Sequence, residues 1–317
     1  MISPAKKTLK ILAIESSCDE TAAAVLQGQM QSNEPKYKLL SSIVKSQINT
    51  HRKTGGVVPE VAARAHLANI LPVTEKALAE AKTKLKQIDY IAVTSGPGLV
   101  VSLIVGVEFA KALALTTDKP LLPTNHMAGH LYSAFAEQPT KTQFPALALV
   151  VSGGHTMLLL MKDYYNYKVI GQTLDDAAGE AFDKVARMLA LPYPGGPSIS
   201  KLGLQGKNII TFPRPMIHET NFNFSFSGLK TAVLYYLEKR KQPLTKQDKA
   251  DICLSFEVAA VEVLIQKTIR AAQKYKCQTI ALAGGVAANQ RLRQNLQQAC
   301  DQEKIQFTMP PFSLCTD

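Results

Sequence analysis

The pattern of an apolar run, a short polar turn and a second apolar run occurs twice along the chain. The first copy spans 10–26, with the polar residues 15–20 in its middle, and the second spans 146–161, with the turn at 152–156. Short apolar runs bounded by turn residues are typical of buried strands. Each copy therefore predicts two strands joined by a tight polar turn.

A second pattern, in which a glycine turn joins an apolar strand to a helix, also occurs twice. An apolar run at 91–94 precedes the turn 95–98 and a long apolar helix. A run at 279–283 precedes the glycine turn 284–289 and a helix that we expect to end near Gln298. Turns of this kind bring backbone N–H groups close to a phosphate.

Two turn types, each repeated once in the same order, predict a duplicated α/β fold with a cleft between the halves. The length of 317 residues is about twice that of a ~150-residue domain and agrees with two halves. We place the boundary in the proline-containing stretch 123–145, which gives domains of 1–138 and 139–317.

The second domain contains an acidic helix start and an insertion. We expect a helix from near Asp175 to the proline- and glycine-rich segment 192–197, and another helix after Gly228. Asp175 and Asp176 would lie in the first turn of the former, where carboxylates suit the positive end of the helix dipole. Asp183 would share a face with Asp176, and a carboxylate there can accept from ribose hydroxyl groups.

Neither a membrane span nor a leader is expected from the apolar pattern. The best candidate, 99–115, contains Glu108 and Lys111 and falls short of the ~18 apolar residues of a membrane helix. We expect it to be a buried helix. The segment 1–10 leads straight into a predicted strand and leaves no room for the ~15–30 residues of a signal peptide.

Composition narrows the class of protein further. Hydrophobic residues make up 46% of the chain and charged residues 19%, which excludes a disordered chain, a collagen and a coiled coil. Five cysteines without a C-x-x-C pair favour reduced thiols and a cytoplasmic location. The formal net charge of +11 favours a polyanionic partner such as nucleic acid, although a merely soluble basic protein would show it too. One basic cluster, Lys239, Arg240 and Lys241, is either a phosphate-binding surface or a solvated helix face.

Two histidines are spaced for a metal ion. His126 and His130 are four residues apart, so on a helix they share one face. Two histidines and one carboxylate suit Fe(II) and tolerate Zn(II), and Asp317 is the carboxylate to consider, although a terminal Asp is more often frayed. Met127 stands where a zinc protease has its general base, which argues against a metalloprotease. Two ordinary histidines near a helix start remain the alternative.

The remaining polar positions suit a nucleotide better than a nucleophile. The turn at Ser152, Gly153 and Gly154 lacks the G-x-S-x-G form of a nucleophile elbow, so we favour anion binding by its backbone over covalent chemistry. A plain hairpin turn is the simpler alternative. Asn289 can contribute a polar contact or simply cap the helix that follows it.

Taken together, these residues resemble the bacterial branch of the tRNA N6-adenosine threonylcarbamoyltransferase family (TsaD, also called Gcp or O-sialoglycoprotein endopeptidase-like). Ten motifs match in order and rough spacing across essentially the whole chain. They lie at 14–21, 55–60, 95–99, 126–130, 151–156, 175–184, 193–197, 224–230, 283–289 and 315–317.

The resemblance implies an α/β fold of the actin, Hsp70 and sugar-kinase superfamily, with two ribonuclease-H-like lobes around a central cleft. It implies transfer of a threonylcarbamoyl group from threonylcarbamoyl-adenylate to N6 of adenosine 37, in tRNAs that read codons starting with A. By position, the metal ligands would be His126, His130 and Asp317. The adenylate site would consist of Val150, Val151, Ser152, Gly153, Gly154, Asp183, Gly196 and Asn289.

The resemblance further implies one divalent metal per chain, Fe2+ ahead of Zn2+, and two protein partners. These are a paralogous actin-like subunit and a small P-loop ATPase, with the first lobe as the expected contact and no membrane involved. No side chain stands out as a general base, and Asp19 and Glu20 are the weak candidates. Family members continue past the Cys-Thr-Asp at 315–317 with a helix that returns to the first lobe, so we expect this chain to be truncated there.

Three alternatives remain. A superfamily ATPase or phosphotransferase would need an acidic base near the γ-phosphate and Mg2+, and the pair His126 and His130 argues against it. A metalloprotease is opposed by Met127. A catalytically impaired scaffold or fragment of the same complex is supported by the early end of the chain.

Overall fold

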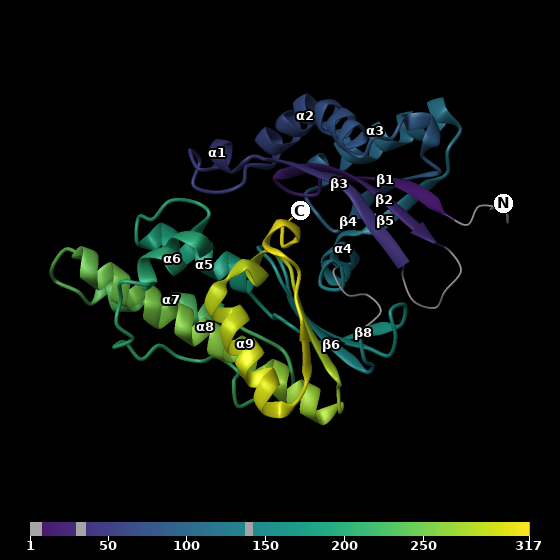
Figure 1. The fold of residues 1–317 in the computed structure, drawn as a ribbon. Helices are drawn as coiled ribbons and strands as arrows, with labels where there is room; N and C mark the ends of the chain where they lie inside the picture. The colour runs from purple at the N-terminus through teal and green to yellow at the C-terminus, as the bar shows by residue number, and fades with distance from the viewer. Residues whose placement is uncertain (1–7, 30–35, 137–141, 317) are drawn as a thin grey trace. The chain divides into compact units, whose positions relative to one another are not determined.

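The computed structural model describes residues 8–29, 36–136 and 142–316 (Figure 1). Backbone contacts divide these residues into two compact units. The first ends at Gly129, and the second runs from His130 to Thr316. The boundary predicted between 138 and 139 lies outside the described residues.

The first unit is built on a five-stranded sheet with the strand order β3-β2-β1-β4-β5. Its central strand β1 (Leu9–Glu15) pairs antiparallel with β2 (Glu20–Gln29) and parallel with β4 (Tyr90–Gly96). The outer strands are β3 (Lys36–Ser46), antiparallel to β2, and β5 (Leu121–Asn125), parallel to β4.

The second unit contains a sheet with the same connectivity, in the order β10-β9-β6-β7-β8. Its central strand β6 (Ala146–Val151) pairs antiparallel with β7 (Thr156–Met161) and parallel with β9 (Thr279–Ala283). The outer strands are β8 (Tyr167–Gln172), antiparallel to β7, and β10 (Gln306–Thr308), parallel to β9. The duplication predicted from the repeated turns is therefore confirmed strand by strand.

Helices cover the sheets of both units. In the first unit α2 and α3 lie side by side against the sheet (Figure 1). The elements of that unit are α1 (Ile48–His51), α2 (Pro59–Glu80), η1 (Leu85–Gln87) and α3 (Val100–Thr117), and α4 (His126–Ser133) follows β5 and continues into the second unit. Those of the second are α5 (Ala178–Met188), α6 (Gly195–Gly203), α7 (Ser227–Glu238), α8 (Lys246–Lys274), η3 (Gly285–Ala288), α9 (Gln290–Glu303) and η4 (Phe312–Leu314).

The apolar helix α3 is less buried than its sequence predicts. By length and composition alone it is apolar enough to cross a membrane, yet only 22% of it is buried and it packs on α2 and β4. Val100, Ile104 and Leu115 are exposed. The expectation of a buried helix was wrong, because a helix that is apolar all round still contacts its own sheet along one face only.

One boundary in the second unit also differs from expectation. The helix predicted from Asp175 begins at Ala178, so Asp175 and Asp176 precede it and share no helical face with Asp183. Asp175 instead accepts hydrogen bonds from Phe226 N at 2.8 Å and Ser227 N at 3.2 Å, at the start of α7. Two hydrogen bonds from backbone N–H groups stabilise the Asp175 carboxylate more than the helix dipole of α5 would.

The core of the second unit forms around the long helix α8. Phe256 of α8 meets Phe182 of α5 edge to face, with ring centroids 5.0 Å apart. Lys267 of this helix is fully buried and donates to Asn221 O at 3.0 Å. Burial, aided by the charge of Arg270, lowers the pKa of Lys267 from 10.5 to about 8.

Lys267 should make the stability of the chain depend on pH. Between about pH 8 and 10.5 the unfolded chain binds more protons at this site than the folded chain, so the free energy of unfolding rises with pH. In Lys267→Met that component disappears, and the slope falls by up to about 1.4 kcal/mol per pH unit. Urea unfolding between pH 8 and 10 measures it. Lys274→Met, an exposed lysine of the same helix, is the control, and equal slopes in the two variants would contradict the assignment.

Candidate active site

In the first unit, the carboxyl ends of three parallel strands meet at one edge of the sheet. Glu15 ends β1, Thr94 lies near the end of β4, and His126 directly follows β5. In open α/β sheets this edge is where ligands bind. Both weak general-base candidates lie at the same edge. Asp19 is in the turn after β1, and the largely buried Glu20 is the first residue of β2.

Glu15 is a partly buried carboxylate that accepts several hydrogen bonds. Thr94 Oγ1 donates to one oxygen at 2.6 Å, and Ser17 N donates to the other at 2.5 Å. His126 Nδ1 lies 3.3 Å from Oε2 and donates to it. Burial alone would raise the pKa of Glu15. The hydrogen bond and charge of His126, together with hydrogen bonds from Thr94 and Ser17, lower this pKa to about 2. Glu15 is therefore ionised and orients the His126 ring.

The predicted metal ligands are placed only in part. His126 and His130 lie one turn apart on α4, as the spacing predicted. Asp317 lies outside the described residues, while Thr316 before it places its methyl group 3.9 Å from where a Cβ on Gly285 would stand. Within residues 8–29, 36–136 and 142–316, no three or more His, Cys, Asp or Glu side chains form a group able to hold a metal. The metal site stays a prediction.

In the second unit, the turn after β6 presents backbone rather than side chains. The side chains of Val150 and Val151 are fully buried, so only their backbone groups are available to a ligand. Ser152 closes the turn, because its N–H donates to His155 O at 2.8 Å and its Oγ accepts from His155 N at 3.1 Å. Gly153 and Gly154 are exposed at the tip. This arrangement fits anion binding and leaves Ser152 poorly placed as a nucleophile.

The glycine turn that begins at Gly284 contacts the end of β6, next to the turn at Ser152. Gly284, which follows β9, has φ +89°, and a Cβ there would lie 2.4 Å from Val151 O. A Cβ on Gly179 in α5 would lie 2.6 Å from Ser152 O. Three chain segments thus approach so closely that only glycine fits. The short 3-10 helix η3 follows Gly284 and ends at Ala288, so the helix predicted to open at this turn starts only at Gln290 and ends at Glu303.

Asp183 is hydrogen-bonded to Gly195, the residue directly before Gly196. Asp183 Oδ1 accepts from Gly195 N at 2.7 Å, which ties α5 to the first residue of α6. Gly196 follows, partly exposed and with no heavy atom within 4 Å of its Cβ position. Both residues therefore lie at the junction of α5 and α6.

Asn289 both caps α9 and makes polar contacts with other helices, the two roles that the sequence left open. Its Oδ1 accepts from Leu292 N at 2.8 Å and caps α9. Its Nδ2 donates to Ser200 Oγ of α6 at 3.1 Å and to Glu257 Oε1 of α8 at 2.8 Å. The contacts of Gly284 and Gly179 with the Ser152 turn, and those of Asp183 and Asn289 with α6, bring the predicted adenylate residues together in the second unit.

Sequence reasoning missed Glu15, Ser17, Ser200 and Glu257. The available signal was a carboxylate in an apolar environment: Glu15 ends the run of β1, and Glu257 follows Phe256 inside the apolar face of α8. A buried carboxylate needs hydrogen-bond donors, so each marks a polar junction.

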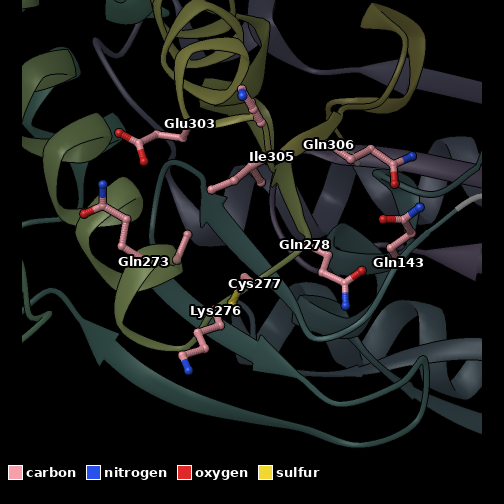
Figure 2. Close-up of a pocket in the computed structure, with 10 residues that line it drawn as sticks. Gln143, Gln273, Lys276, Cys277, Gln278, Glu303, Ile305 and Gln306 are labelled. Carbon is pink, nitrogen blue, oxygen red and sulfur yellow. The ribbon is translucent and has the colours of Figure 1, made fainter.

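A cavity of about 820 Å³ lies away from these residues, at the amino ends of β9 and β10. Figure 2 shows the side chains of Gln143, Gln278 and Gln306 around it. Gln278 Nε2 donates to Phe144 O, and Gln306 Oε1 accepts from Thr279 Oγ1, so the fold already uses these amides. The glycine turns lie at the carboxyl end of β9, so this cavity is not part of the candidate site.

Comparison with known proteins decides the family. The family model described as tRNA N6-adenosine threonylcarbamoyltransferase (TsaD) matches residues 38–317. The chain belongs to this family. It is 50% identical over 313 residues to the enzyme of that name from Clostridium botulinum, covering 98% of this chain and 90% of that protein. It is 48% identical over 318 residues to the Moorella thermoacetica enzyme, covering 100% and 91%.

Solved structures confirm the fold class. HypF from T. kodakarensis is similar with a TM-score of 0.63 at 15% identity, over 95% of this chain and 45% of that chain. A second HypF structure, in a phosphate- and nucleotide-bound form, gives a TM-score of 0.60 at 12% identity, over 98% and 45%. The two-lobed α/β fold expected from the family resemblance is confirmed by these likenesses and by the two matching sheets.

Gly284 should tolerate no side chain. Its φ of +89° and the 2.4 Å approach to Val151 O would make Gly284→Ala lower the free energy of unfolding by about 2–4 kcal/mol. Gly153→Ala is the matched control, because nothing lies within 4 Å of its Cβ position, and it should change stability by less than about 0.5 kcal/mol. Urea denaturation compares the two, and equal losses would show that the close approach does not exist.

Proposed function

We propose that this chain transfers a threonylcarbamoyl group from threonylcarbamoyl-adenylate to N6 of adenosine 37, in tRNAs that read codons starting with A. The observation that supports the proposal is family membership over residues 38–317, with the predicted ligand turns packed together in the second unit. We also propose a cytoplasmic location, because tRNA is its substrate and none of the five cysteines, all of them described, forms a disulfide.

The chemistry is acyl transfer to an amine. The N6 amine of adenosine attacks the carbamoyl carbon, the new C–N bond forms, and the C–O bond to the phosphate breaks. AMP leaves, and the amine gives up one proton. Asp19 and Glu20 are the proposed acceptors of that proton. Because the mixed anhydride is already activated, most of the rate gain comes from positioning.

The proposed adenylate site lies in the second unit. Backbone N–H groups of Gly153 and Gly154, at the exposed tip of the β6–β7 turn, would bind the phosphate. Asp183 and Asn289 would contact the ribose, and Gly196 leaves open space beside them. Val150 and Val151 would contribute only through the backbone that places the turn.

The residues described so far fit the proposed metal, Fe2+ or alternatively Zn2+. A histidine that binds a metal through one nitrogen normally donates its other N–H to a carboxylate, and His126 Nδ1 meets Glu15 in this way. His126, His130 and Asp317 would hold the ion. When bound, the ion would supply Lewis acidity that stabilises negative charge on the donor.

The proposed macromolecular partners follow from charge and exposure. Lys239 and Lys241 are exposed at the end of α7 and suit tRNA phosphates, whereas Arg240 pairs with Asp248 at 2.9 Å and is less available. Exposed Leu67 and Ile104 on the adjoining helices α2 and α3 suit the paralogous actin-like subunit. The small P-loop ATPase would join the same assembly.

Complementation tests the function directly. Bacteria depleted of their own transferase should regain threonylcarbamoyladenosine in tRNA when supplied with this chain, as measured by nucleoside mass spectrometry. His126→Ala should reduce the modification by at least about 10-fold, because it removes a proposed metal ligand.

A chain extended by a family-like C-terminal helix runs beside these two. Restoration by the extended chain alone would show that the 317-residue chain is an inactive fragment. Failure of both soluble chains, when co-expressed with partner subunits from the same source, would favour a scaffold and overturn the proposed activity.

Metal affinity tests the role of Glu15. Glu15→Gln removes the charged acceptor of the His126 N–H and should weaken metal binding by about 10–100-fold. Competition with a chelator and metal analysis of the purified chain measure this without activity. Glu108→Gln, an exposed carboxylate of α3, is the control. Equal affinities in the two variants would separate Glu15 from the metal site.

A further inference from the structure

The side chain of Asn289 is held by groups on two other helices. Its Oδ1 is committed to capping α9, so its orientation depends on what its Nδ2 group finds. Nδ2 donates to Glu257 Oε1 at 2.8 Å and to Ser200 Oγ at 3.1 Å. Ser200 in turn donates to the same Glu257 oxygen at 2.6 Å. One carboxylate oxygen therefore joins α6, α8 and the turn before α9.

The second oxygen of Glu257 also serves this turn. Oε2 accepts from Arg291 Nε, in the first turn of α9, at 3.0 Å. The Glu257 residue is only 3% exposed and lies beside Phe256 and the fully buried Ala260. A carboxylate in such a place is costly unless all its bonds are made. Its three donors are Ser200, Asn289 and Arg291, and all belong to the two segments that carry Gly196 and Asn289.

We propose that Glu257 is a positioning residue of the adenylate site. Its Oε1 accepts from both Ser200 and Asn289 and so sets the distance between α6, which carries Gly196, and the turn that carries Asn289, so that both face the nucleotide in one fixed geometry. The ligand class is an adenosine 5′-phosphate. This inference rests on the proposed function, because it takes the adenylate to bind between these two segments.

The same helix provides a comparison. Glu262 lies five residues further along α8 and pairs with Arg214 at 2.9 Å, but its side chain is 38% exposed. No bond described for it reaches α6 or the turn before α9. Both residues are carboxylates in ion pairs on one helix, and only Glu257 contacts the predicted nucleotide residues.

Two conservative substitutions separate reach from charge. Glu257→Gln keeps the length of the side chain and the oxygen shared by Ser200 and Asn289, but it loses the charge and the acceptor for Arg291. Glu257→Asp keeps the charge, but the side chain is shorter by one methylene group, so the carboxylate lies further from Ser200 and Asn289. A positioning role predicts that Gln is tolerated and Asp is not, whereas a purely electrostatic role predicts the reverse.

The experiment is calorimetric titration of the full chain with 5′-AMP. Glu257→Asp should weaken AMP binding by about 10-fold, Glu257→Gln by less than about 3-fold, and the control Glu262→Gln by less than about 2-fold. Circular dichroism checks that each variant is folded. AMP affinity is a readout that a loss of helix stability alone would not change in this order.

A double-variant cycle shows whether Glu257 acts through Asn289. The chain with both Glu257→Asp and Asn289→Ala should bind AMP within about 2-fold of Asn289→Ala alone. Losses that multiply would overturn the inference, as would Glu257→Asp binding like the unchanged chain or Glu257→Gln losing as much as Glu257→Asp. If the unchanged chain does not bind AMP, the proposed adenylate site itself fails, and this inference fails with it.

Discussion

The parallel pairing of the strands in each unit determines where this protein can bind a ligand. β1 runs parallel to β4 and β5, and β6 runs parallel to β9 and β10. The strand ends that carry polar residues therefore meet at one edge of each sheet. This pairing brings Glu15 and His126, which are 111 positions apart in the sequence, into contact.

Close backbone approach and hydrogen-bonded carboxylates together shape these edges. In the second unit, Gly284 and Gly179 let three segments pack around the turn at Ser152, where a Cβ would collide with backbone oxygen. Asp183 and Glu257 then accept N–H or O–H groups from neighbouring segments and fix their spacing. Glu15 does the same in the first unit. A site made mainly of backbone is therefore held in shape by carboxylate side chains that bond neighbouring segments to one another.

The differences from the predicted elements have a common origin. The exposed face of α3 arises because a mostly apolar helix sequence does not indicate which side packs on the sheet. Asp175 lies before α5 because the start of α7, some fifty residues later, provides it with backbone donors. In both cases the local pattern was identified correctly, and a partner distant in sequence decided how the residues are used.

The sequence by itself determined the strands next to the repeated turns, the turns themselves, the spacing of His126 and His130, and the family. These features follow from the periodicity of apolar residues, the placement of glycines and the order of motifs, all of which can be identified without knowledge of the fold. Only the tertiary structure decided that Val150 and Val151 offer backbone alone, that Asn289 is shared between a cap and Glu257, and that Glu15 orients His126. Such assignments depend on contacts between residues 32 to 111 positions apart. The register of strands and helices sets these contacts, and no local pattern encodes them.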